Sequence, residues 1–349
     1  MSFPFRVVRR SLCPAVAVDL GSARTRVAVA GRGLIVDEPS VVAVSTETGR
    51  VLGGGRAVGR VASQMLGRTP DAIRAVRPVR DGVVRDLELC TRLLRQFVGK
   101  SARGSFGLKP EVVVTVPSGL SPVERRAVVE AADRAGAGRV SVLEKSRAAA
   151  LGVGLPLAEA AANFVCDIGA GTTDVAVLSL GGVVAARTTR AAGDACDLAI
   201  VEYVRRRHSL RIGVGAAERL KTEIGSAVPL ETELTREVGG LDVPGGVPRR
   251  AVVTSEEIRQ AIDGPLSEVV AAIRGVIESC DPELVGDLSE SGLTLAGGTA
   301  ALRGIDRYLA DRVGLPVLIA DEPARAACRG AAVCVDDLRG WRRLLDAAD

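Results

Sequence analysis

The chain has 349 residues, of which 47% are hydrophobic, 25% charged and 2% aromatic, and its formal net charge is +4. This length allows two domains with buried cores. Its arginines are interleaved with acidic residues, which argues against a nucleic-acid-binding stripe. No apolar run reaches the ~18 residues of a transmembrane helix, and no cleavable signal is evident. We expect a cytoplasmic protein whose seven cysteines, none in a C-x-x-C pair, are reduced core residues.

Strands and helices alternate along the first half. The predicted elements are hairpin strands over 15–45, helices at 57–67 and 86–98, a strand at 111–117, a helix at 121–135, and a strand at 140–144 leading into a helix at 145–153. The helix at 121–135 has Ser121 as its N-cap, Pro122 in its first position and Glu124 three residues after the cap.

The second half repeats this plan. The predicted elements are strands over 163–188, helices near 194–208 and 215–225, a Gly- and Pro-rich excursion at 239–248, a helix at 255–279, a strand at 292–296, and helices near 303–313 and 324–337. This alternation predicts α/β layers. His208, the single histidine, follows three arginines at a helix end, so we expect a surface group that complements the helix dipole.

A strand–turn–strand segment occurs twice. Residues 15–36 read AVAVDLGSARTRVAVAGRGLIV, and residues 163–184 read NFVCDIGAGTTDVAVLSLGGVV. An offset of 148 positions, from Asp19 to Asp167, also aligns Gly21 with Gly169. One Asp-x-Gly is usually a simple hairpin turn, but a matched pair predicts a duplicated α/β domain that closes on one nucleotide.

Both copies carry the chemistry of a phosphate loop. Asp19 and Asp167 each end an apolar strand, where a carboxylate can hold waters of a nucleotide-bound Mg²⁺. Glycines after them let backbone N–H groups approach phosphate oxygens. The glycines are Gly21, Gly169 and Gly171, and the nearby hydroxyl donors are Ser22, Thr172 and Thr173.

Two further segments have both a functional and an ordinary reading. In 293–306 a strand runs into Gly297-Gly298 and a helix beginning at Thr299, which is either a ligand-binding helix N-terminus or a simple βα turn. In 217–227 Glu218 and Lys221 either face an adenosine or form an exposed i,i+3 pair. Gly99-Lys100-Ser101 lacks the first glycine of a P-loop and is predicted to be a loop.

These four segments, in this order, resemble the actin, sugar-kinase and 70-kDa chaperone superfamily. Within it the chain resembles the MreB and MreB-like (Mbl) bacterial actin homologues over about 15–337. The most similar stretches include VDEPSVVAVS (36–45), DIGAGTTDVAVLSLGGVV (167–184) and ERLKTEIGSA (218–227). The resemblance implies an α/β, actin-like ATPase fold, with duplicated ribonuclease H-like domains and small inserted subdomains.

The resemblance also implies a domain division. Domain I would span 1–152, with a small subdomain inserted at about 36–75. Domain II would span 153–318, with a small subdomain inserted at about 190–255. A C-terminal helix within 319–349 would return to domain I.

The resemblance further assigns roles to residues, with ATP and Mg²⁺ as cofactors. The nucleotide would be held by Asp19, Gly21, Ser22, Ala23, Arg24, Gly169, Ala170, Gly171, Thr172, Glu218, Arg219, Leu220, Lys221, Gly297, Gly298, Thr299, Ala300 and Ala301. Catalysis would involve Asp167, Thr172 and Thr173, and Mg²⁺ would be held through water by Asp19 and Asp167.

One departure affects hydrolysis. The family usually has Glu-Glu-Pro where this chain has Glu144-Lys145-Ser146, and the glutamate that orients the attacking water is Lys145 here. A protonated lysine accepts no proton, but it can pair with a γ-phosphate as a point charge. We therefore expect nucleotide binding with slow or absent hydrolysis.

Three more departures lie in the same loops. Ser22-Ala23-Arg24 stands where the family usually has Thr-Ala-Asn, so Arg24 adds a cation near the phosphates. Ala170 replaces the middle glycine of the family's usual DIGGGT. Thr299 replaces a third glycine, and its Cβ would crowd the base or ribose if that position needs a positive φ.

The implied partners are other copies of the chain in filaments under the cell membrane, an MreB paralogue, and membrane proteins of cell-wall synthesis. The basic and apolar segments 1–10 and 101–109, the latter with Phe106 and Leu108 at its tip, would contact the membrane surface. The ordinary reading is a frayed terminus or core strand and a surface loop. An alternative function is a divergent paralogue that binds nucleotide and regulates a true MreB. A small-molecule kinase is disfavoured because 144–146 offers no clear carboxylate base.

Overall fold

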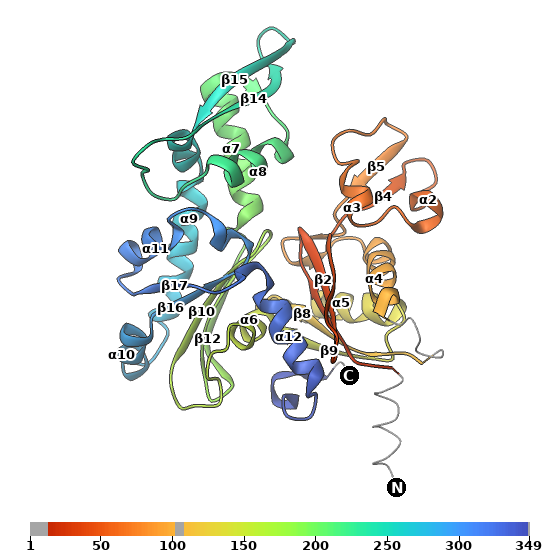
Figure 1. The fold of residues 1–349 in the computed structure, drawn as a ribbon, viewed down its shortest axis with the longest axis vertical. Helices are drawn as coiled ribbons and strands as arrows, with labels where there is room; N and C mark the ends of the chain where they lie inside the picture. Colours follow the sequence, from red (N-terminus) through yellow and green to blue (C-terminus); the bar gives the residue numbers. More distant parts are fainter. Residues whose placement is uncertain (1–12, 102–107, 348–349) are drawn as a thin grey trace. The chain divides into compact units, whose positions relative to one another are not determined.

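A computed structural model describes residues 13–101 and 108–347, and the chain forms two compact units (Figure 1). The first unit comprises the described parts of Met1–Ala160, Ser179–Val183 and Arg325–Asp349. The second comprises Ala161–Leu178 and Val184–Ala324. The predicted domain and subdomain boundaries stay predictions.

The first unit is built on a six-stranded sheet in the order β18-β9-β8-β1-β2-β3. Its strands are β1 (Val16–Leu20), β2 (Arg24–Val29), β3 (Gly33–Pro39), β8 (Glu111–Val116), β9 (Arg139–Glu144) and β18 (Asp346–Ala347). Strands β1, β2 and β3 pair antiparallel, whereas β8 runs parallel to both β1 and β9. Asp19, near the end of β1, therefore lies beside Arg26 on one neighbour and Thr115 on the other.

Helices cover this sheet. They are α4 (Leu87–Ser101), α5 (Pro122–Arg134), α6 (Lys145–Gly152) and α12 (Ala326–Asp336). Val16 and Val18 share a core with Leu93 and Phe97 of α4. Because side chains alternate along a strand, Asp19 lies on the other face from Val18. Helix α12 packs against α6 and β1.

The predicted capping of α5 is confirmed. The Ser121 hydroxyl accepts a hydrogen bond from the Glu124 backbone N–H, and the Glu124 carboxylate accepts one from the Ser121 N–H. Pro122 takes the first helical position, as expected. Helix α4, in contrast, extends through Gly99-Lys100-Ser101, so the predicted loop there is wrong.

A smaller part of the first unit joins β4 (Val42–Ser45) to β5 (Ile73–Val76), with short helices α2 (Leu52–Gly55) and α3 (Arg60–Ser63). The predicted helix at 57–67 is mostly wrong. Val58 forms an isolated bridge with Val42, and Gly59 has φ of 71°, so helix begins only at Arg60. Of the apolar residues in this range, Ala57 and Ala62 are buried in a small cluster with Ala43, whereas Val61 and Leu66 are exposed. The two-stranded ribbon β6 (Val79–Arg80) and β7 (Val83–Val84) follows.

The second unit has a five-stranded sheet in the order β12-β11-β10-β16-β17. Its strands are β10 (Asn163–Ile168), β11 (Thr173–Ser179), β12 (Gly182–Thr189), β16 (Leu293–Ala296) and β17 (Val317–Ile319). Strand β10 pairs antiparallel with β11 and parallel with β16. The strand order of this sheet, β12-β11-β10-β16-β17, therefore matches the order β3-β2-β1-β8-β9 in the first unit.

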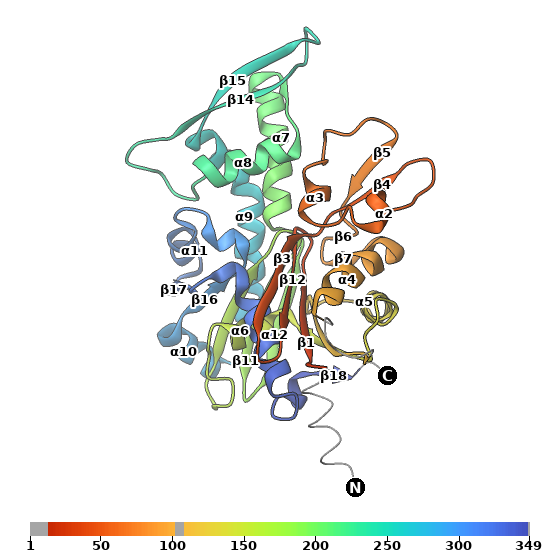
Figure 2. The ribbon, with the colours of Figure 1, turned by 45° about the vertical axis from the view of Figure 1, so that its right-hand side comes forward.

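The helices of the second unit are α7 (Gly193–His208), α8 (Val214–Ile224), α9 (Ser255–Ile277), α10 (Pro282–Ser291) and α11 (Ile305–Val313). A three-stranded sheet is formed by β13 (Leu210–Arg211), β14 (Thr235–Asp242) and β15 (Pro248–Thr254) (Figure 2). The Gly- and Pro-rich excursion at 239–248 is thus the turn of the β14–β15 hairpin and its flanking residues. Helix α10 was not predicted.

His208 differs from its prediction. Its Nε2 lies 2.9 Å from Glu257 Oε1, and the side chain is half-buried at the end of α7. The histidine therefore joins α7 to α9 and is not a free surface group. All seven cysteines are unbridged, and every one except the partly exposed Cys280 is buried.

Within residues 13–101 and 108–347, no helix is both long enough and apolar enough to span a membrane. The predicted membrane-contacting segment 1–10, and most of 101–109, lie outside the described residues.

Candidate functional site

The two predicted loops have the same backbone geometry. Gly21 N–H donates to the Arg24 carbonyl over 3.1 Å, and Gly169 N–H donates to the Thr172 carbonyl over 2.9 Å. The same offset of 148 positions separates both partners. A Cβ placed on Gly21 would lie 2.5 Å from the Arg24 oxygen, so only glycine fits this turn without a backbone shift.

The sheet register repeats as well. In the first unit Asp19 pairs with Arg26 across β1 and β2, and in the second Asp167 pairs with Asp174 across β10 and β11. The repeat is therefore present in the structure as well as in the amino-acid sequence. The two copies differ in charge at this pair, however, because Arg26 in one corresponds to Asp174 in the other.

Ser40 supports the first loop. Its hydroxyl donates to the Gly21 carbonyl over 2.6 Å and lies 2.8 Å from the Thr25 hydroxyl. Its backbone N–H donates to the Ala23 carbonyl. The Ser22 hydroxyl accepts a hydrogen bond from Gly82 N–H. These contacts fix the loop that the sequence predicts to hold phosphate.

Asp19 is 4% exposed and has three polar neighbours in the first unit. The Thr115 hydroxyl donates to its Oδ1 over 2.8 Å. Arg26 lies 3.3 Å from its Oδ2, and Lys145 Nζ lies 3.9 Å from its Oδ1. Asp19 therefore shares its carboxylate with two cations, and the prediction that it holds Mg²⁺ through water stays a prediction.

Arg24 is held on the neighbouring strand. Its guanidinium contacts Asp37 of β3, with Nε 2.6 Å from Oδ1 and a second donor to the Asp37 carbonyl at 2.8 Å. Arg26 and Arg325 also lie within 4.0 Å of the Asp37 carboxylate. Burial tends to raise the pKa of Asp37, but the hydrogen bond from Arg24 and the charges of the three arginines hold it below its usual value. Asp37 therefore stays ionised.

Lys145 begins α6 directly after β9 and is 8% exposed. Since β9 is one strand removed from β1 in the sheet, the start of α6 brings the lysine to Asp19. Glu144 instead lies 3.5 Å from Arg147, one turn along the helix. The carboxylate next to Lys145 in sequence is thus engaged away from Asp19.

In the second unit the hydroxyls of the predicted loop face inward. Thr172 donates to Asp174 over 3.1 Å, and Thr188 donates to the other oxygen of Asp174 over 2.7 Å. Thr173 donates to the Ala191 carbonyl over 2.6 Å. Asp174, which sequence reasoning missed, therefore fixes the threonine that we expect at the phosphates. Asp167 itself is 6% exposed.

Gly193 brings three predicted segments together. At the start of α7, its N–H donates to the Gly169 carbonyl over 3.1 Å, and its own carbonyl accepts from Lys221 Nζ over 2.7 Å. The Thr299 hydroxyl also donates to the Gly169 carbonyl, over 2.9 Å. A Cβ on Gly193 would lie 3.0 Å from that hydroxyl. Gly193 was not among the predicted site residues. The only sequence signal for its role is its position directly before a predicted helix.

The sequence offered an exposed i,i+3 pair between Glu218 and Lys221 as one interpretation, but Lys221 pairs with a different residue. Its Nζ lies 2.7 Å from Asp197 Oδ1 of α7, in an ion pair rather than an aligned hydrogen bond. Burial raises the pKa of Asp197 to about 6, although Lys221 opposes this rise. Glu218 and Arg219 are exposed on α8, whereas Leu220 belongs to the core.

The Gly297-Gly298 turn leads into a 3₁₀ helix, Gly298–Ala301, where the sequence predicts an α-helix. Gly297 has φ of 89°, and a Cβ on it would lie 2.3 Å from the Ile168 carbonyl. A Cβ on Gly298 would meet nothing within 4 Å. Thr299 has a negative φ, so the backbone condition for crowding by its Cβ is not met.

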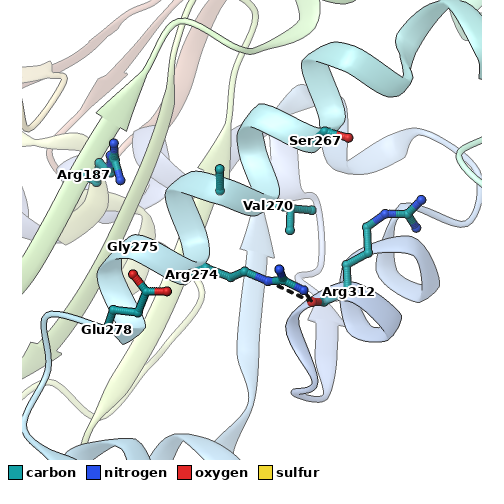
Figure 3. Close-up of a pocket in the computed structure, with 8 residues that line it drawn as sticks. Arg187, Ser267, Val270, Arg274, Gly275, Glu278 and Arg312 are labelled. Atoms are coloured by element: carbon teal, nitrogen blue, oxygen red, sulfur yellow. Dashed lines mark hydrogen bonds between the residues drawn. The ribbon is translucent and has the colours of Figure 1, made fainter.

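A separate groove of about 540 Å³ lies elsewhere on the second unit. Figure 3 shows Arg187, Arg274, Glu278 and Arg312 along it, with Arg274 donating to the Arg312 carbonyl. None of the residues that line it is a predicted site residue. Among the described residues, no group of three or more His, Cys, Asp and Glu side chains is placed to hold a metal ion.

Comparison with known proteins identifies the family. The family model described as MreB/Mbl protein matches residues 14–343. The chain belongs to the MreB/Mbl family. It is 44% identical over 328 residues to the cell shape-determining protein MreB of Escherichia coli (strain K12), covering 93% of this chain and 94% of that protein.

Similarity to solved structures confirms the predicted actin-like fold. The chain resembles MreB 5 of Spiroplasma citri bound to AMPPNP, with a TM-score of 0.89, 32% identity, and coverage of 95% of this chain and 98% of that one. It also resembles the MamK double helical filament, with a TM-score of 0.76. At 22% identity over 93% of this chain and 99% of that one, the MamK likeness concerns the fold.

Proposed function

We propose that this MreB/Mbl-family protein binds ATP through its two hairpin loops and assembles into filaments that determine cell shape. The repeated loop geometry carries the proposal: Gly21 and Gly169 close the same turn, each two residues after an aspartate that is the last but one residue of a buried strand. The nucleotide bound to the Spiroplasma citri relative supports it, as does the name of the Escherichia coli relative.

In this proposal the first loop, Gly21–Arg24, and the second loop, Gly169–Thr172, hold the phosphates through backbone N–H groups and hydroxyls. The Gly297-Gly298 turn and α8 frame the adenosine. The MamK filament supports self-association, which would use this fold in other copies of the chain. Peripheral contact with the inner face of the membrane through 1–10 and 101–109, and guidance of cell-wall synthesis with membrane partners and a paralogue, complete the proposed role.

Gly298 offers a direct test of nucleotide binding. Because a Cβ there meets no atom within 4 Å, a larger side chain should leave the empty protein folded but enter the space proposed for the adenosine. We expect wild-type protein to bind ADP and ATP in isothermal titration, and Gly298→Leu to bind at least about tenfold more weakly, a loss of ~1.4 kcal/mol.

Gly286→Leu is the matched control. Gly286 lies in α10 of the same unit, is exposed, and also has open space around a Cβ. We expect it to bind nucleotide as wild type does. Equal affinities for all three proteins would contradict the proposed adenosine site, and absence of binding by wild type would refute nucleotide binding itself.

A further inference from the structure

Carbonyl groups of the second loop are held by donors from two other segments of the second unit. The Gly169 carbonyl accepts from the Gly193 N–H over 3.1 Å and from the Thr299 hydroxyl over 2.9 Å. The next carbonyl, that of Ala170, accepts from the Asp194 N–H over 2.7 Å. Two successive carbonyls of the loop are therefore directed toward the start of α7, and the first of them also contacts the 3₁₀ helix.

These contacts decide which way the N–H groups of the loop face. In a trans peptide the C=O and the N–H that follows it lie on opposite sides, and no described peptide bond is cis. The N–H groups of Ala170 and Gly171 are therefore directed away from α7. Within residues 13–101 and 108–347, neither group donates to a protein acceptor, although Gly171 is a buried residue. Unpaired N–H groups in such a place are rare, and successive ones form an anion-binding concavity.

Thr299 reaches this loop from the Gly297-Gly298 turn. Gly297 packs so closely against β10 that a Cβ on it would lie 2.3 Å from the Ile168 carbonyl oxygen. Thr299 is the second residue of the 3₁₀ helix that follows, and it is 9% exposed. Because the turn is proposed to frame the adenosine, the Thr299 hydroxyl links the proposed adenosine site directly to the proposed phosphate loop.

The first loop has an equivalent contact. The carbonyl of Gly21, which the repeat aligns with Gly169, accepts from the Ser40 hydroxyl over 2.6 Å. Ser40 directly follows β3, whereas Thr299 lies 130 residues after Gly169, so the repeat does not align the two hydroxyls with each other. Both loops thus have the same carbonyl held by a hydroxyl, supplied from different places in the chain. This recurrence indicates that the orientation of this carbonyl matters for the function that the loops share.

We propose that Thr299 is a positioning residue for nucleotide binding, whose hydroxyl orients the Gly169–Ala170 peptide so that the Ala170 N–H faces a phosphate oxygen. This inference rests on the proposed nucleotide binding. Thr299 acts through Gly169 and orients the loop before the nucleotide arrives. The glycine that the family usually has at this position has no hydroxyl and cannot make the link.

The test is equilibrium binding of ADP to the full chain by isothermal titration in millimolar Mg²⁺, with the melting temperature of each empty protein measured alongside. Thr299→Val keeps the shape of the side chain but removes the hydroxyl, so the loop samples other orientations and the nucleotide must reorder it. We expect Thr299→Val to bind about 3- to 10-fold more weakly than wild type, which is the bias that one neutral hydrogen bond supplies. Thr299→Ser keeps the hydroxyl and should bind within about twofold of wild type.

Thr91→Val is the matched control. Thr91 is also buried, and its hydroxyl also donates to a backbone carbonyl, that of Leu87 over 2.8 Å, but both residues lie in α4 of the first unit. This variant should lose stability as Thr299→Val does, because each loses one hydrogen bond, yet it should bind ADP as wild type does. The comparison separates a positioning role from a contribution to stability alone.

Two results would overturn the inference and leave the proposed function intact: wild-type affinity in Thr299→Val, or an equal loss of affinity in Thr299→Val and Thr299→Ser. Failure of wild type to bind ADP overturns the proposed function and the inference with it. If Thr299→Val does not fold, Thr299→Ala takes its place, because alanine also lacks the hydroxyl and adds no atom to the site.

Discussion

The contact between α6 and α12 provides a sharp prediction. The two helices approach at Gly152 and Gly330, where a Cβ on Gly330 would lie 1.8 Å from the Ala148 carbonyl oxygen and one on Gly152 would lie 1.9 Å from the Ala326 carbonyl oxygen. Both obstacles are backbone atoms, so no side chain can turn away to make room. Gly330→Ala must therefore push the helices apart.

The magnitude follows from two opposing effects. Overpacking against backbone costs ~3 kcal/mol or more, whereas replacing a helical glycine by alanine stabilises by ~1 kcal/mol. The net loss is ~2 kcal/mol or more, or about 4–8 °C in melting temperature for a unit of this size.

Thermal unfolding followed by circular dichroism measures the loss, and Gly99→Ala is its control. Gly99 lies in α4 of the same unit, and a Cβ there meets nothing within 4 Å. The same substitution at Gly99 should therefore stabilise by ~0.5–1 kcal/mol. A Gly330→Ala variant as stable as wild type would refute the reasoning.

Three further predictions concern the loops and the site. Gly21→Ala should destabilise by ~1–3 kcal/mol and exceed the cost of Gly169→Ala, because the new Cβ would lie 2.5 Å from a backbone oxygen in the first case and 3.1 Å in the second; equal losses in urea unfolding would contradict this. Lys145→Glu should raise phosphate release from ATP, since it restores a carboxylate where the family orients water; unchanged turnover of the folded variant would count against slow hydrolysis caused by the lysine. Burial raises the pKa of Asp197 to about 6, above the ~3.9 of an unfolded chain, so the folded protein binds this proton more tightly. Wild type should therefore gain up to ~3 kcal/mol of stability relative to Asp197→Asn as the pH falls from above 6 to below 4; parallel pH profiles would refute it.

The repeat explains why much of the fold was predictable. Asp19 and Asp167 recur with the same flanking strands, and the glycines after them are required by local turn geometry that depends on few other residues. Likewise the cap of α5 is encoded within four residues, Ser121 to Glu124. Such local determinants are visible in sequence.

Long-range contacts were not predictable in the same way. Gly193 meets Gly169, Lys221 and Thr299 only because α7, α8 and the 3₁₀ helix converge. Lys221 had a plausible local partner in Glu218, but it pairs with Asp197 on another helix. No spacing within one segment reveals such a choice of partner, since tertiary packing decides it.

The small part of the first unit shows a different limit. Apolar residues within 57–67 have helical spacing, yet the positive φ of Gly59 confines the helix to Arg60–Ser63. Ala57 and Ala62 are buried in a small cluster with Val41 and Ala43, whereas Val61 and Leu66 are exposed. Helical spacing of apolar residues therefore identified neither the element nor the full set of buried residues.

Nucleotide-dependent assembly tests the central claim most directly. Purified full-length chain should sediment with ATP, both in solution and on anionic liposomes, and should remain largely in the supernatant without nucleotide, while Gly298→Leu should stay in the supernatant under all these conditions. A folded wild-type protein that stays monomeric at every concentration, with ATP and on liposomes, would contradict the proposed filament-forming function.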